Sequence, residues 1–440
     1  MPKESVTVIG AGLAGCEAAH FLATHGMRVR LVECKPKKFT PAHTDARYAE
    51  LVCSNSLKSD DVYGNACGLL KQEMRLLGSL IVEAADATRV PAGGALAVDR
   101  EKFAEYVTRK IFENADIECV CEEAEHIPAG PCIVATGPLT TGPLAADIEA
   151  RLGGNLAFYD AAAPIVAADS VDFSKAFTAD RYGKGEGDYV NCPMNKEEYE
   201  AFVDALTGAE RAIAHSFERG EIFEGCMPVE VMASRGRDTL RFGMMKPVGL
   251  YDADGKRPYA VLQLRRENAE GTAYNLVGFQ TNLKFPEQKR VFSMIPALHN
   301  AEFLRYGVMH RNTFLNAPKV LARDYSLKED GAVFFAGQIT GVEGYVESAD
   351  SGLVAAINCL RKCRGLSPVE WDAETVSGAL ACHVSAPNEN FQPMNANYGI
   401  LRPLAENVRD KAKKKRLFAE RALEKIDSIA RELEASRSAE

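Results

Sequence analysis

The sequence lacks the features that mark membrane-bound, exported and disulfide-rich proteins. No stretch reaches the roughly 18 consecutive apolar residues that a bilayer-spanning helix needs, and the apolar run at residues 6–9 lacks the flanking segments of a secretion signal. The 12 cysteines include no Cys-x-x-Cys pair and are scattered over 440 residues, unlike a disulfide scaffold. We therefore expect reduced thiols, a cytoplasmic location and no membrane partner.

Low-complexity segments and internal repeats are also missing. The content of 46% hydrophobic and 26% charged residues is typical of globular proteins. A chain of 440 residues exceeds the roughly 250 to 300 residues at which a single core stops growing, so we expect more than one domain. The net charge of -9 argues against a protein that is basic all over, but a local basic face is enough to bind RNA.

The N-terminal segment has the pattern of a β-α-β unit. Apolar strands are predicted at Ser5–Ile9 and Arg28–Glu33, with a helix at residues 13–25 between them. Buried strands at 132–135 and 332–336 each end at a glycine turn, which is typical of neighbours in a parallel sheet. The sequence therefore predicts a Rossmann-like, doubly wound α/β fold.

A glycine fingerprint lies where this unit passes from strand to helix. Residues 10–15 have the pattern Gly-x-Gly-x-x-Gly, and Glu33 follows at the end of the second strand. The glycines allow a tight turn and a close approach of a pyrophosphate to the helix N-terminus, and the acid can bind ribose hydroxyls. A late strand that ends at Gly337 favours FAD over NAD, because its turn can bring backbone N–H groups to the flavin. We expect no metal, and the predicted cofactor-binding residues are Ile9, Gly10, Ala11, Gly12, Leu13, Ala14, Gly15, Glu33, Gly337, Gln338 and Ile339.

These signals divide the chain into predicted domains. The FAD-binding domain is expected at residues 1–150 and 319–403. Between 151 and 318 the alternation of strands and helices is lost, which predicts an inserted α+β substrate domain. Residues 404–440 predict a basic helical tail, whose clustered cations are Lys411, Lys413, Lys414, Lys415 and Arg416.

Two cysteines, Cys53 and Cys226, lie in turns. Cys53 is in a polar loop soon after the second strand, and Cys226 is in a turn bracketed by glycine and proline. Such positions leave a thiol accessible, as a nucleophile requires, although most cysteines in turns are inert. Three other cysteines are expected in the core because they fall in predicted helices: Cys16, Cys359 and Cys363.

Four segments resemble the TrmFO family, the bacterial folate- and FAD-dependent tRNA (uracil-5-)-methyltransferases. They are residues 8–19, 53–56, 335–345 and 391–395, and the similarity runs to about residue 404. The related MnmG or GidA family shares the first and third segments, but its members are considerably longer and modify the wobble uridine. The length of the chain and its two turn cysteines favour TrmFO.

The resemblance implies methylation at C5 of the T-loop uridine of tRNA, with FAD as cofactor, 5,10-methylenetetrahydrofolate as carbon donor and NAD(P)H as reductant. Cys53 and Cys226 match the family's two functional thiols. A thiolate added at C6 makes uracil C5 nucleophilic, and a hydride from reduced flavin completes the methyl group. We expect Cys226 to attack C6 and Cys53 to assist near the flavin; the reverse assignment stays open, as does a role for Lys58 in lowering the pKa of Cys53.

Two other classes of protein are weighed against this one. A flavin oxidoreductase that acts on a small molecule or a disulfide predicts a Cys-x-x-Cys pair or a second Gly-x-Gly-x-x-Gly, and the sequence has neither. A non-catalytic, flavin-bound RNA-interaction protein predicts that serine can replace both turn cysteines without consequence.

A tRNA substrate requires cations for its phosphates and aromatic rings for a base turned out of its stack. The inserted region and the cluster at residues 411–416 supply candidates, although a solvated face and a set of core aromatics explain them equally well. The candidates in the inserted region are Arg265, Arg266, Lys284, Lys289, Arg290, Arg305, His310 and Arg311, with Phe279, Phe285, Phe292 and Tyr306.

Overall fold

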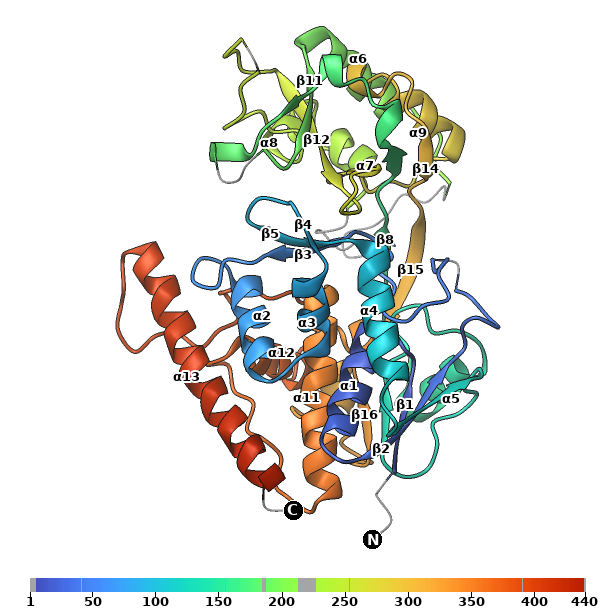
Figure 1. The fold of residues 1–440 in the computed structure, drawn as a ribbon, viewed down its shortest axis with the longest axis vertical. Helices are drawn as coiled ribbons and strands as arrows, with labels where there is room; N and C mark the ends of the chain where they lie inside the picture. Colours follow the sequence, from blue (N-terminus) through green and yellow to red (C-terminus); the bar gives the residue numbers. More distant parts are fainter. Residues whose placement is uncertain are drawn as a thin grey trace.

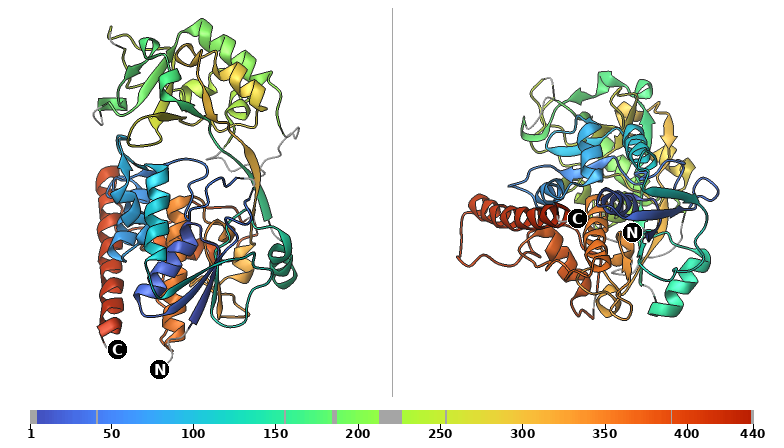
Figure 2. Two further views of the ribbon diagram at one scale, coloured as in Figure 1. Left: turned by 45° about the vertical axis from the view of Figure 1, so that its right-hand side comes forward. Right: turned by 60° about the horizontal axis from the view of Figure 1, so that its bottom comes forward.

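The computed structural model describes residues 5–40, 42–154, 156–183, 187–212, 227–252, 254–389 and 391–438, and it has two lobes (Figures 1 and 2). The parallel lobe, residues 5–154 and 315–438, contains a parallel sheet and most of the helices. The antiparallel lobe, residues 162–308, lies above it in Figure 1 and has its own hydrophobic core. An antiparallel ribbon of β8 (Leu156–Ala161) and β15 (Met309–Phe314) joins the two lobes.

The parallel lobe is built on a five-stranded parallel sheet. Its strands have the order β16, β7, β1, β2, β6. Because both faces of this sheet are covered, its central strands are rich in buried apolar residues, and Val6, Val8 and Leu31 are fully buried. The strands are β1 (Ser5–Ile9), β2 (Arg28–Glu33), β6 (Ile117–Cys121), β7 (Cys132–Val134) and β16 (Val333–Phe335). The predicted α/β class and the β-α-β unit are confirmed.

Two helices, α1 (Leu13–Thr24) and α11 (Tyr345–Cys363), pack against each other beside this sheet (Figure 1). Their backbones approach so closely at Gly352 that a Cβ there would lie 2.3 Å from Ala14 O. The start of α1 therefore lies against the N-terminal half of α11. The other helices of this lobe are α2 (Ala66–Leu76), α3 (Leu80–Ala87), α4 (Arg100–Phe112), α5 (Gly142–Leu152), α10 (Ala317–Val320) and α12 (Val376–Ser385).

A small antiparallel sheet lies on the side of the parallel lobe that faces the antiparallel lobe (Figure 1). Its strands have the order β3 (Ser56–Ser59), β5 (Ala95–Val98), β4 (Arg89–Val90). Strand β3 begins three residues after Cys53, so this sheet holds one end of the loop that contains that thiol.

The antiparallel lobe contains a six-stranded sheet with short helices packed against it. The strand order is β10 (Phe177–Thr178), β11 (Val190–Met194), β12 (Ala260–Arg266), β13 (Ala273–Leu276), β9 (Ile165–Ala167), β14 (Phe303–Arg305). Its helices are α6 (Lys196–Thr207), α7 (Val229–Ser234), α8 (Thr239–Phe242) and α9 (Phe285–Phe292). Neighbouring strands of this sheet run antiparallel, and the helices form long insertions between strands rather than regular crossovers, which explains why the sequence loses the β-α rhythm in this region.

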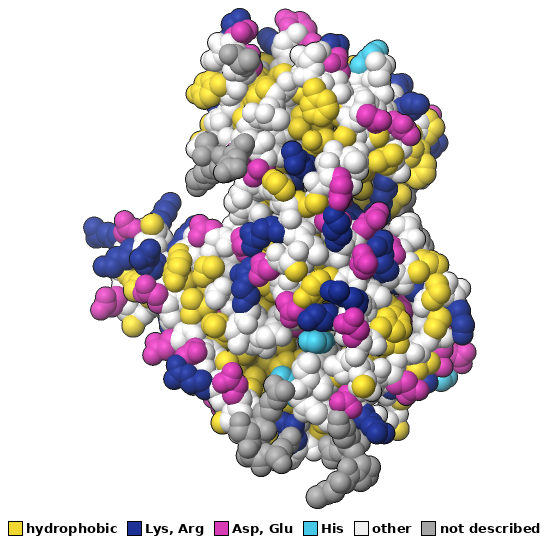
Figure 3. Space-filling model, viewed as in Figure 1, with side chains coloured by type: hydrophobic (Ala, Val, Ile, Leu, Met, Phe, Trp, Pro, Cys, Tyr) yellow, Lys and Arg dark blue, Asp and Glu magenta, His cyan; other side chains and the backbone are white. Residues whose placement is uncertain are grey.

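The last helix, α13 (Lys411–Ser438), lies along the outside of the parallel lobe and packs against α2 (Figure 1). Its apolar face is part of the core, because Ala419, Ala422 and Ile426 are fully buried. The cationic N-terminal end of α13 forms the dark-blue group at the left edge of Figure 3. Within the described residues, every helix is too short or too polar to span a bilayer.

Candidate active site at the carboxyl end of the parallel sheet

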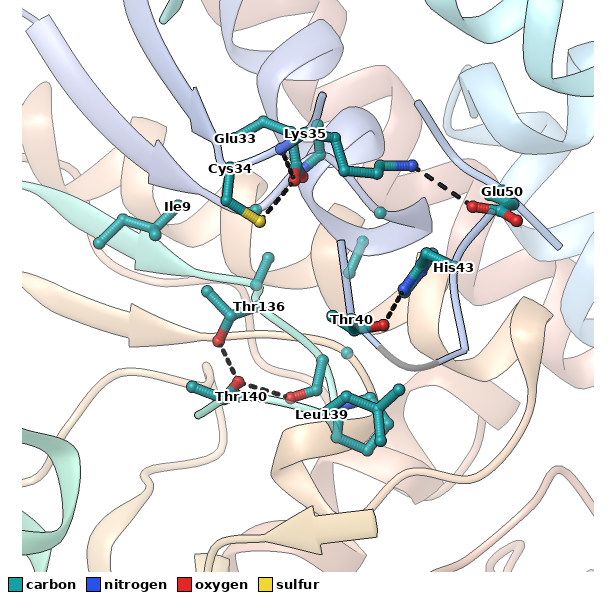
Figure 4. A pocket seen from close by; sticks show the side chains of 18 of the residues that line it. Ile9, Glu33, Cys34, Lys35, Thr40, His43, Glu50, Thr136, Leu139 and Thr140 are labelled. Carbon is teal, nitrogen blue, oxygen red and sulfur yellow. Dashed lines mark hydrogen bonds and ion pairs between the residues drawn. The ribbon is translucent and has the colours of Figure 1, made fainter. Parts of the chain in front are cut away.

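A pocket of about 450 Å³ opens where the strands of the parallel sheet end (Figure 4). Its walls come from segments that are far apart in the chain: the ends of β1 and β2, residues 38–53, the turn after β7, and the turn after β16. Ligands bind to open α/β sheets at this edge. The volume and the position indicate a site for a ligand of considerable size.

The turn between β1 and α1 is shaped by its glycines. Gly10 has a φ of +97°, and a Cβ there would lie 2.6 Å from Ala135 O. A Cβ at Gly15 would lie 1.8 Å from Gly10 O, so only glycine lets α1 start this close to the strand. At Gly12, by contrast, a Cβ would meet nothing within 4 Å. Gly12 therefore borders open space, and the chain can bring its backbone close to a ligand there.

Glu33 at the end of β2 ties the turn to the sheet. Its carboxylate is buried, and Oε2 accepts a hydrogen bond of 2.7 Å from the backbone N–H of Ala11. Oε1 accepts from Lys35 N at 2.9 Å and from the Cys34 thiol at 3.2 Å. The acid that the sequence predicts as a ribose ligand therefore also holds the glycine turn in place.

The turn after β16 forms the opposite wall. Gly337 has a φ of +84° and its N–H donates to Ser351 Oγ at 2.7 Å. A Cβ on Gly337 would lie 3.3 Å from the Ala14 side chain, so this turn lies directly against the start of α1. The two glycine turns that the sequence separates by more than 300 residues are thus neighbours in the fold.

The structure brings together most of the residues predicted to bind a cofactor. Gly15 and Ile339 are outside the pocket lining, since Gly15 packs against Gly10 and Ile339 is buried. The residues that line the pocket are Ile9, Gly10, Ala11, Gly12, Leu13, Ala14, Glu33, Gly337 and Gln338, together with Cys53.

The backbone of the Cys53 loop is held by a tyrosine from the start of α11. The Tyr345 hydroxyl oxygen accepts hydrogen bonds from Cys53 N at 2.6 Å and from Ser54 N at 3.1 Å. Burial raises the pKa of Tyr345, and Cys53 acts in the same direction. The phenol is therefore neutral at physiological pH, and its oxygen fixes the thiol-bearing backbone at the pocket wall.

Two arginines hold the rest of this loop. Arg100, at the start of α4, is half-buried; it donates from Nη1 to the carbonyls of Leu51 and Val52 and pairs with Glu267 at 2.9 Å. Arg265 of β12 donates to Ser54 Oγ at 2.7 Å and to Asn55 Oδ1 at 2.9 Å. Since β12 belongs to the antiparallel lobe, the Cys53 loop lies at the junction of the two lobes.

The charges around Cys53 differ from those around Cys34, the other thiol on the pocket wall. Burial and the neighbouring Glu33 raise the pKa of Cys34 to about 11, so that thiol stays protonated. Cys53 instead lies within electrostatic reach of the guanidinium groups of Arg100 and Arg305. A cationic environment favours a thiolate.

Lys58, which the sequence offered as a cation for Cys53, points elsewhere. Its Nζ lies 2.9 Å from Glu347 Oε1, and this buried carboxylate raises the pKa of Lys58 against the effect of burial. The cations near Cys53 are instead Arg100 of α4 and Arg305 of β14. Both are far from Cys53 in the sequence, so the sequence alone could not identify them.

The residues predicted to contact tRNA have different environments. Phe279 and Phe292 are fully buried core residues of the antiparallel lobe, and Arg265 is buried behind the Cys53 loop. Phe285 is exposed and Tyr306 is half-buried. Lys284 and Arg290 pair with acids, whereas the described part of the structure shows no hydrogen bond or ion pair for the Arg305 guanidinium.

Cys226 lies outside the described residues, and so do the side chains of His310 and Arg311. Several pocket residues were not predicted, because their places at the pocket depend on the rest of the fold. They include Lys35, Thr40, His43, Glu50, Thr136, Thr140, Asn312 and Tyr345, most of which are labelled in Figure 4. Tyr345 falls in a segment quoted for the family resemblance, which was the one signal in the sequence for its importance.

Comparison with known proteins agrees with this architecture. The family model described as "Glucose inhibited division protein A" matches residues 5–367. The solved structure of Aquifex aeolicus GidA superposes with a TM-score of 0.71 at 17% identity, covering 98% of this chain and 73% of that protein. The fold and the glycine-lined pocket thus define a dinucleotide-binding α/β protein of the GidA class.

Relatives of higher identity define the family more narrowly. The protein named methylenetetrahydrofolate--tRNA-(uracil-5-)-methyltransferase TrmFO of Acetivibrio thermocellus is 58% identical over 422 residues, 95% of this chain and 97% of the relative. The protein of the same name in Geobacter sulfurreducens is 58% identical over 427 residues, 96% of this chain and 98% of the relative. The chain belongs to the TrmFO family.

Proposed function

We propose that this protein methylates C5 of the T-loop uridine of tRNA, with 5,10-methylenetetrahydrofolate as carbon donor, FAD as cofactor and NAD(P)H as reductant. The observation that carries the proposal is the place of Cys53: its loop lies on the wall of the dinucleotide pocket and at the junction with the antiparallel lobe. A thiol there can meet both a cofactor held by the parallel lobe and a base held by the antiparallel lobe.

The residues of the pocket fit FAD. Gly12 borders open space at the N-terminus of α1, where free N–H groups and the helix dipole favour a pyrophosphate. Glu33 is placed to bind ribose hydroxyls, and Gly337 and Gln338 offer backbone and side-chain groups on the opposite wall. FAD, when bound, supplies the hydride that converts a methylene to a methyl group.

The thiols supply the nucleophile for the base. We assign the attack on uracil C6 to Cys226, because the resemblance matches it to a functional thiol of the family; the attack makes C5 nucleophilic toward the methylene carbon. Cys53 lies on the cofactor side, where Tyr345 fixes its backbone and the guanidinium groups of Arg100 and Arg305 lie within electrostatic reach. We assign to Cys53 the removal of the C5 proton or the handling of the methylene.

The antiparallel lobe is assigned to the tRNA and the parallel lobe to FAD. Arg305 supports this division, because it is a half-buried cation near Cys53 for which the described residues offer no carboxylate at ion-pair distance. Burial, with help from Arg100, lowers the pKa of Arg305. A phosphate or carboxylate of a substrate would restore the missing opposite charge.

The test is a product assay with purified protein, unmodified tRNA, methylenetetrahydrofolate and NADPH, read as 5-methyluridine by mass spectrometry. Cys226→Ser should abolish the product, and Cys382→Ser, which changes a half-buried thiol away from the pocket, should leave it unchanged. Full activity of Cys226→Ser would overturn the assignment of the nucleophile. A product at the wobble uridine, or oxidation of NADPH without any modified tRNA, would favour the GidA-like or the small-molecule alternative.

A further inference from the structure

Three aromatic rings of the antiparallel lobe form a stack, which we call the ring stack: Phe303, Tyr306 and Phe285. The ring centroids of Phe285 and Tyr306 are 4.8 Å apart and their planes differ by 12°. Those of Phe303 and Tyr306 are 5.3 Å apart with an angle of 6°. The middle ring is thus nearly parallel to both neighbours, and Phe285 forms one end.

The end of the ring stack is open to solvent. Phe285 is 51% exposed, although phenylalanines of the same lobe such as Phe279 and Phe292 are completely buried. An exposed phenylalanine that lies flat on another ring leaves one face for a further planar group. Aromatic side chains in this arrangement bind nucleic-acid bases in many RNA-binding proteins.

A buried glutamine fixes the geometry of the ring stack. Gln288 of α9 donates from Nε2 to Leu283 O and Gly307 O, both at 2.7 Å, and its Oε1 accepts from Gly307 N at 2.8 Å. These bonds attach α9, which begins with Phe285, to the residue that follows Tyr306. Because these buried bonds fix the backbone segments that carry Phe285 and Tyr306, the stacked rings form a preorganised surface.

The backbone that carries the ring stack lies within reach of Cys53 across the lobe junction. The Cys53 thiol approaches Ala161 O at 3.6 Å, and the next residue, Ala162, donates its N–H to Val308 O at 2.8 Å. Val308 is two residues from Tyr306, and a residue spans at most about 3.6 Å. The backbone of Tyr306 therefore lies within roughly 20 Å of the thiol, a distance that a few nucleotides of one loop can span.

The charge of this segment suits a nucleic acid. Residues 284–306 contain four cations and two acids, although the whole chain has a net charge of -9. Arg305 precedes Tyr306 directly, and Lys284 precedes Phe285. Rings flanked by cations bind a base and its phosphates together, whereas a contact between two protein copies has no need of the basic flanks.

We propose that the ring stack binds an unpaired base of the tRNA, in the same loop as the target uridine, on the open face of Phe285. The inference rests on the proposed function. It adds a binding site for a second nucleotide, which would hold the loop open while the uridine is turned toward the pocket.

The test compares the binding of two RNA hairpins to the FAD-loaded protein. One carries the T loop with 2-aminopurine at an unpaired position, and the other is a fully paired stem of equal length closed by a short tetraloop. Phe285→Leu should weaken binding of the T-loop hairpin about tenfold, as expected for the loss of one stacked base, and should abolish the quenching of 2-aminopurine. Binding of the paired stem should change less than twofold.

Two control variants separate stacking from general damage. Tyr306→Phe keeps the middle ring and should bind like the wild type. Phe242→Leu removes a phenylalanine of the same lobe that is 81% exposed and lies on α8, and it should also bind like the wild type. Equal weakening in Phe242→Leu, or unchanged binding of the T-loop hairpin in Phe285→Leu, would overturn the inference.

The failure of this inference is distinguishable from failure of the proposed function. If the wild type methylates tRNA while Phe285→Leu binds the T-loop hairpin normally, only the ring-stack proposal is wrong. If the wild type neither binds the hairpin nor methylates tRNA, both are wrong. A change of oligomeric state in Phe285→Leu with unchanged RNA binding would assign the ring stack to contacts between copies and would also overturn the proposal.

Discussion

The two lobes build binding surfaces in opposite ways. In the parallel lobe, backbone turns shape the pocket: Gly10 and Gly15 lie so close to backbone oxygens that side chains are excluded there, and Gly337 has a positive φ that favours glycine. In the antiparallel lobe, side chains form the candidate surface, with Phe285 exposed and Arg305 near the lobe junction. A cofactor of fixed shape suits the first kind of site, and a flexible RNA loop suits the second.

This difference also determines how each lobe should respond to substitution. A backbone site tolerates little change, because the glycine turns are part of the sheet and of the packing of α1 and α11. A side-chain surface can lose a ring or a charge and keep its fold. The Cys53 loop lies between these extremes, since it belongs to the parallel lobe but Arg265 of the antiparallel lobe also holds it.

The largest effect is expected from Gly15→Ala in the parallel lobe. The new Cβ would lie 1.8 Å from Gly10 O, so α1 must move away from the strand. We expect the free energy of unfolding to fall by more than about 4 kcal/mol and little folded protein to form, measured by urea unfolding and soluble yield.

Gly12→Ala is the matched control. Its Cβ meets nothing within 4 Å, so the free energy of unfolding of the apoprotein should stay within about 1 kcal/mol of the wild type while FAD affinity falls. Equal stability of the two variants would contradict the steric explanation.

The next largest effect is expected at the junction of the lobes, from Arg100→Met. The variant leaves the buried carboxylate of Glu267 without its ion pair and releases the Leu51 and Val52 carbonyls. We expect a loss of about 3 to 5 kcal/mol in the free energy of unfolding, and faster alkylation of Cys53 as its loop loosens. Lys102→Met on the same helix removes a similar but exposed ion pair with Glu270 and should change the free energy of unfolding far less. If both variants lose a similar free energy of unfolding, burial does not make the Arg100–Glu267 pair more important for stability than an exposed pair.

A pH effect is expected from Glu17, a buried carboxylate of α1 in the parallel lobe. Burial raises its pKa from 4.5 to about 7, although the carboxylate accepts bonds from Ser79 Oγ, Leu80 N and Ile81 N. The folded state binds the proton more tightly, so this contribution is present below pH 4.5 and is lost as the pH rises toward about 7.

Glu17→Gln removes this titration. The difference in stability between pH 5 and pH 8 should therefore shrink by up to roughly 3 kcal/mol relative to the wild type, measured by thermal unfolding at both pH values. Glu101→Gln, at an exposed position of α4, should leave the difference unchanged. An unchanged difference in Glu17→Gln would mean that the carboxylate is ionised throughout this range.

The comparison of the lobes explains what could be predicted from the sequence. The parallel lobe was predictable because its strands are short apolar runs and its turns require glycine; the strands Ser5–Ile9 and Arg28–Glu33 were predicted with the bounds that the structure has. The fold class and the family were likewise predicted and confirmed. The turn cysteine Cys53 could be singled out, but its partners Arg100 and Tyr345 could not, because they lie 47 and 292 residues away in the sequence.

The antiparallel lobe was less predictable for a physical reason. The local sequence does not show which side chains form a binding surface. Tertiary packing decides whether a given aromatic residue is buried in the core or exposed to a ligand. Phe279 and Phe285 are six residues apart, yet the first is fully buried and the second is 51% exposed. The functional roles assigned to the cysteines and the reductant stay predictions, as does the cytoplasmic location.

The smallest effect is expected from neutralising the basic end of α13 with Lys413→Gln, Lys414→Gln and Lys415→Gln together. These lysines supply positive charge on the parallel lobe, at the left edge of Figure 3, so they test whether tRNA reaches beyond the antiparallel lobe. Part of this charge already has partners, because Lys415 donates to Gly64 O at 2.8 Å and Lys414 lies over the Phe418 ring. We therefore expect only about tenfold weaker tRNA binding. The slope of log affinity against log salt concentration should be flatter by roughly one to two.

The control is the pair Lys425→Gln and Arg431→Gln, toward the other end of the same helix, which should leave both quantities unchanged. If tRNA binding is unchanged in the triple variant as well, the tRNA is confined to the antiparallel lobe and the junction.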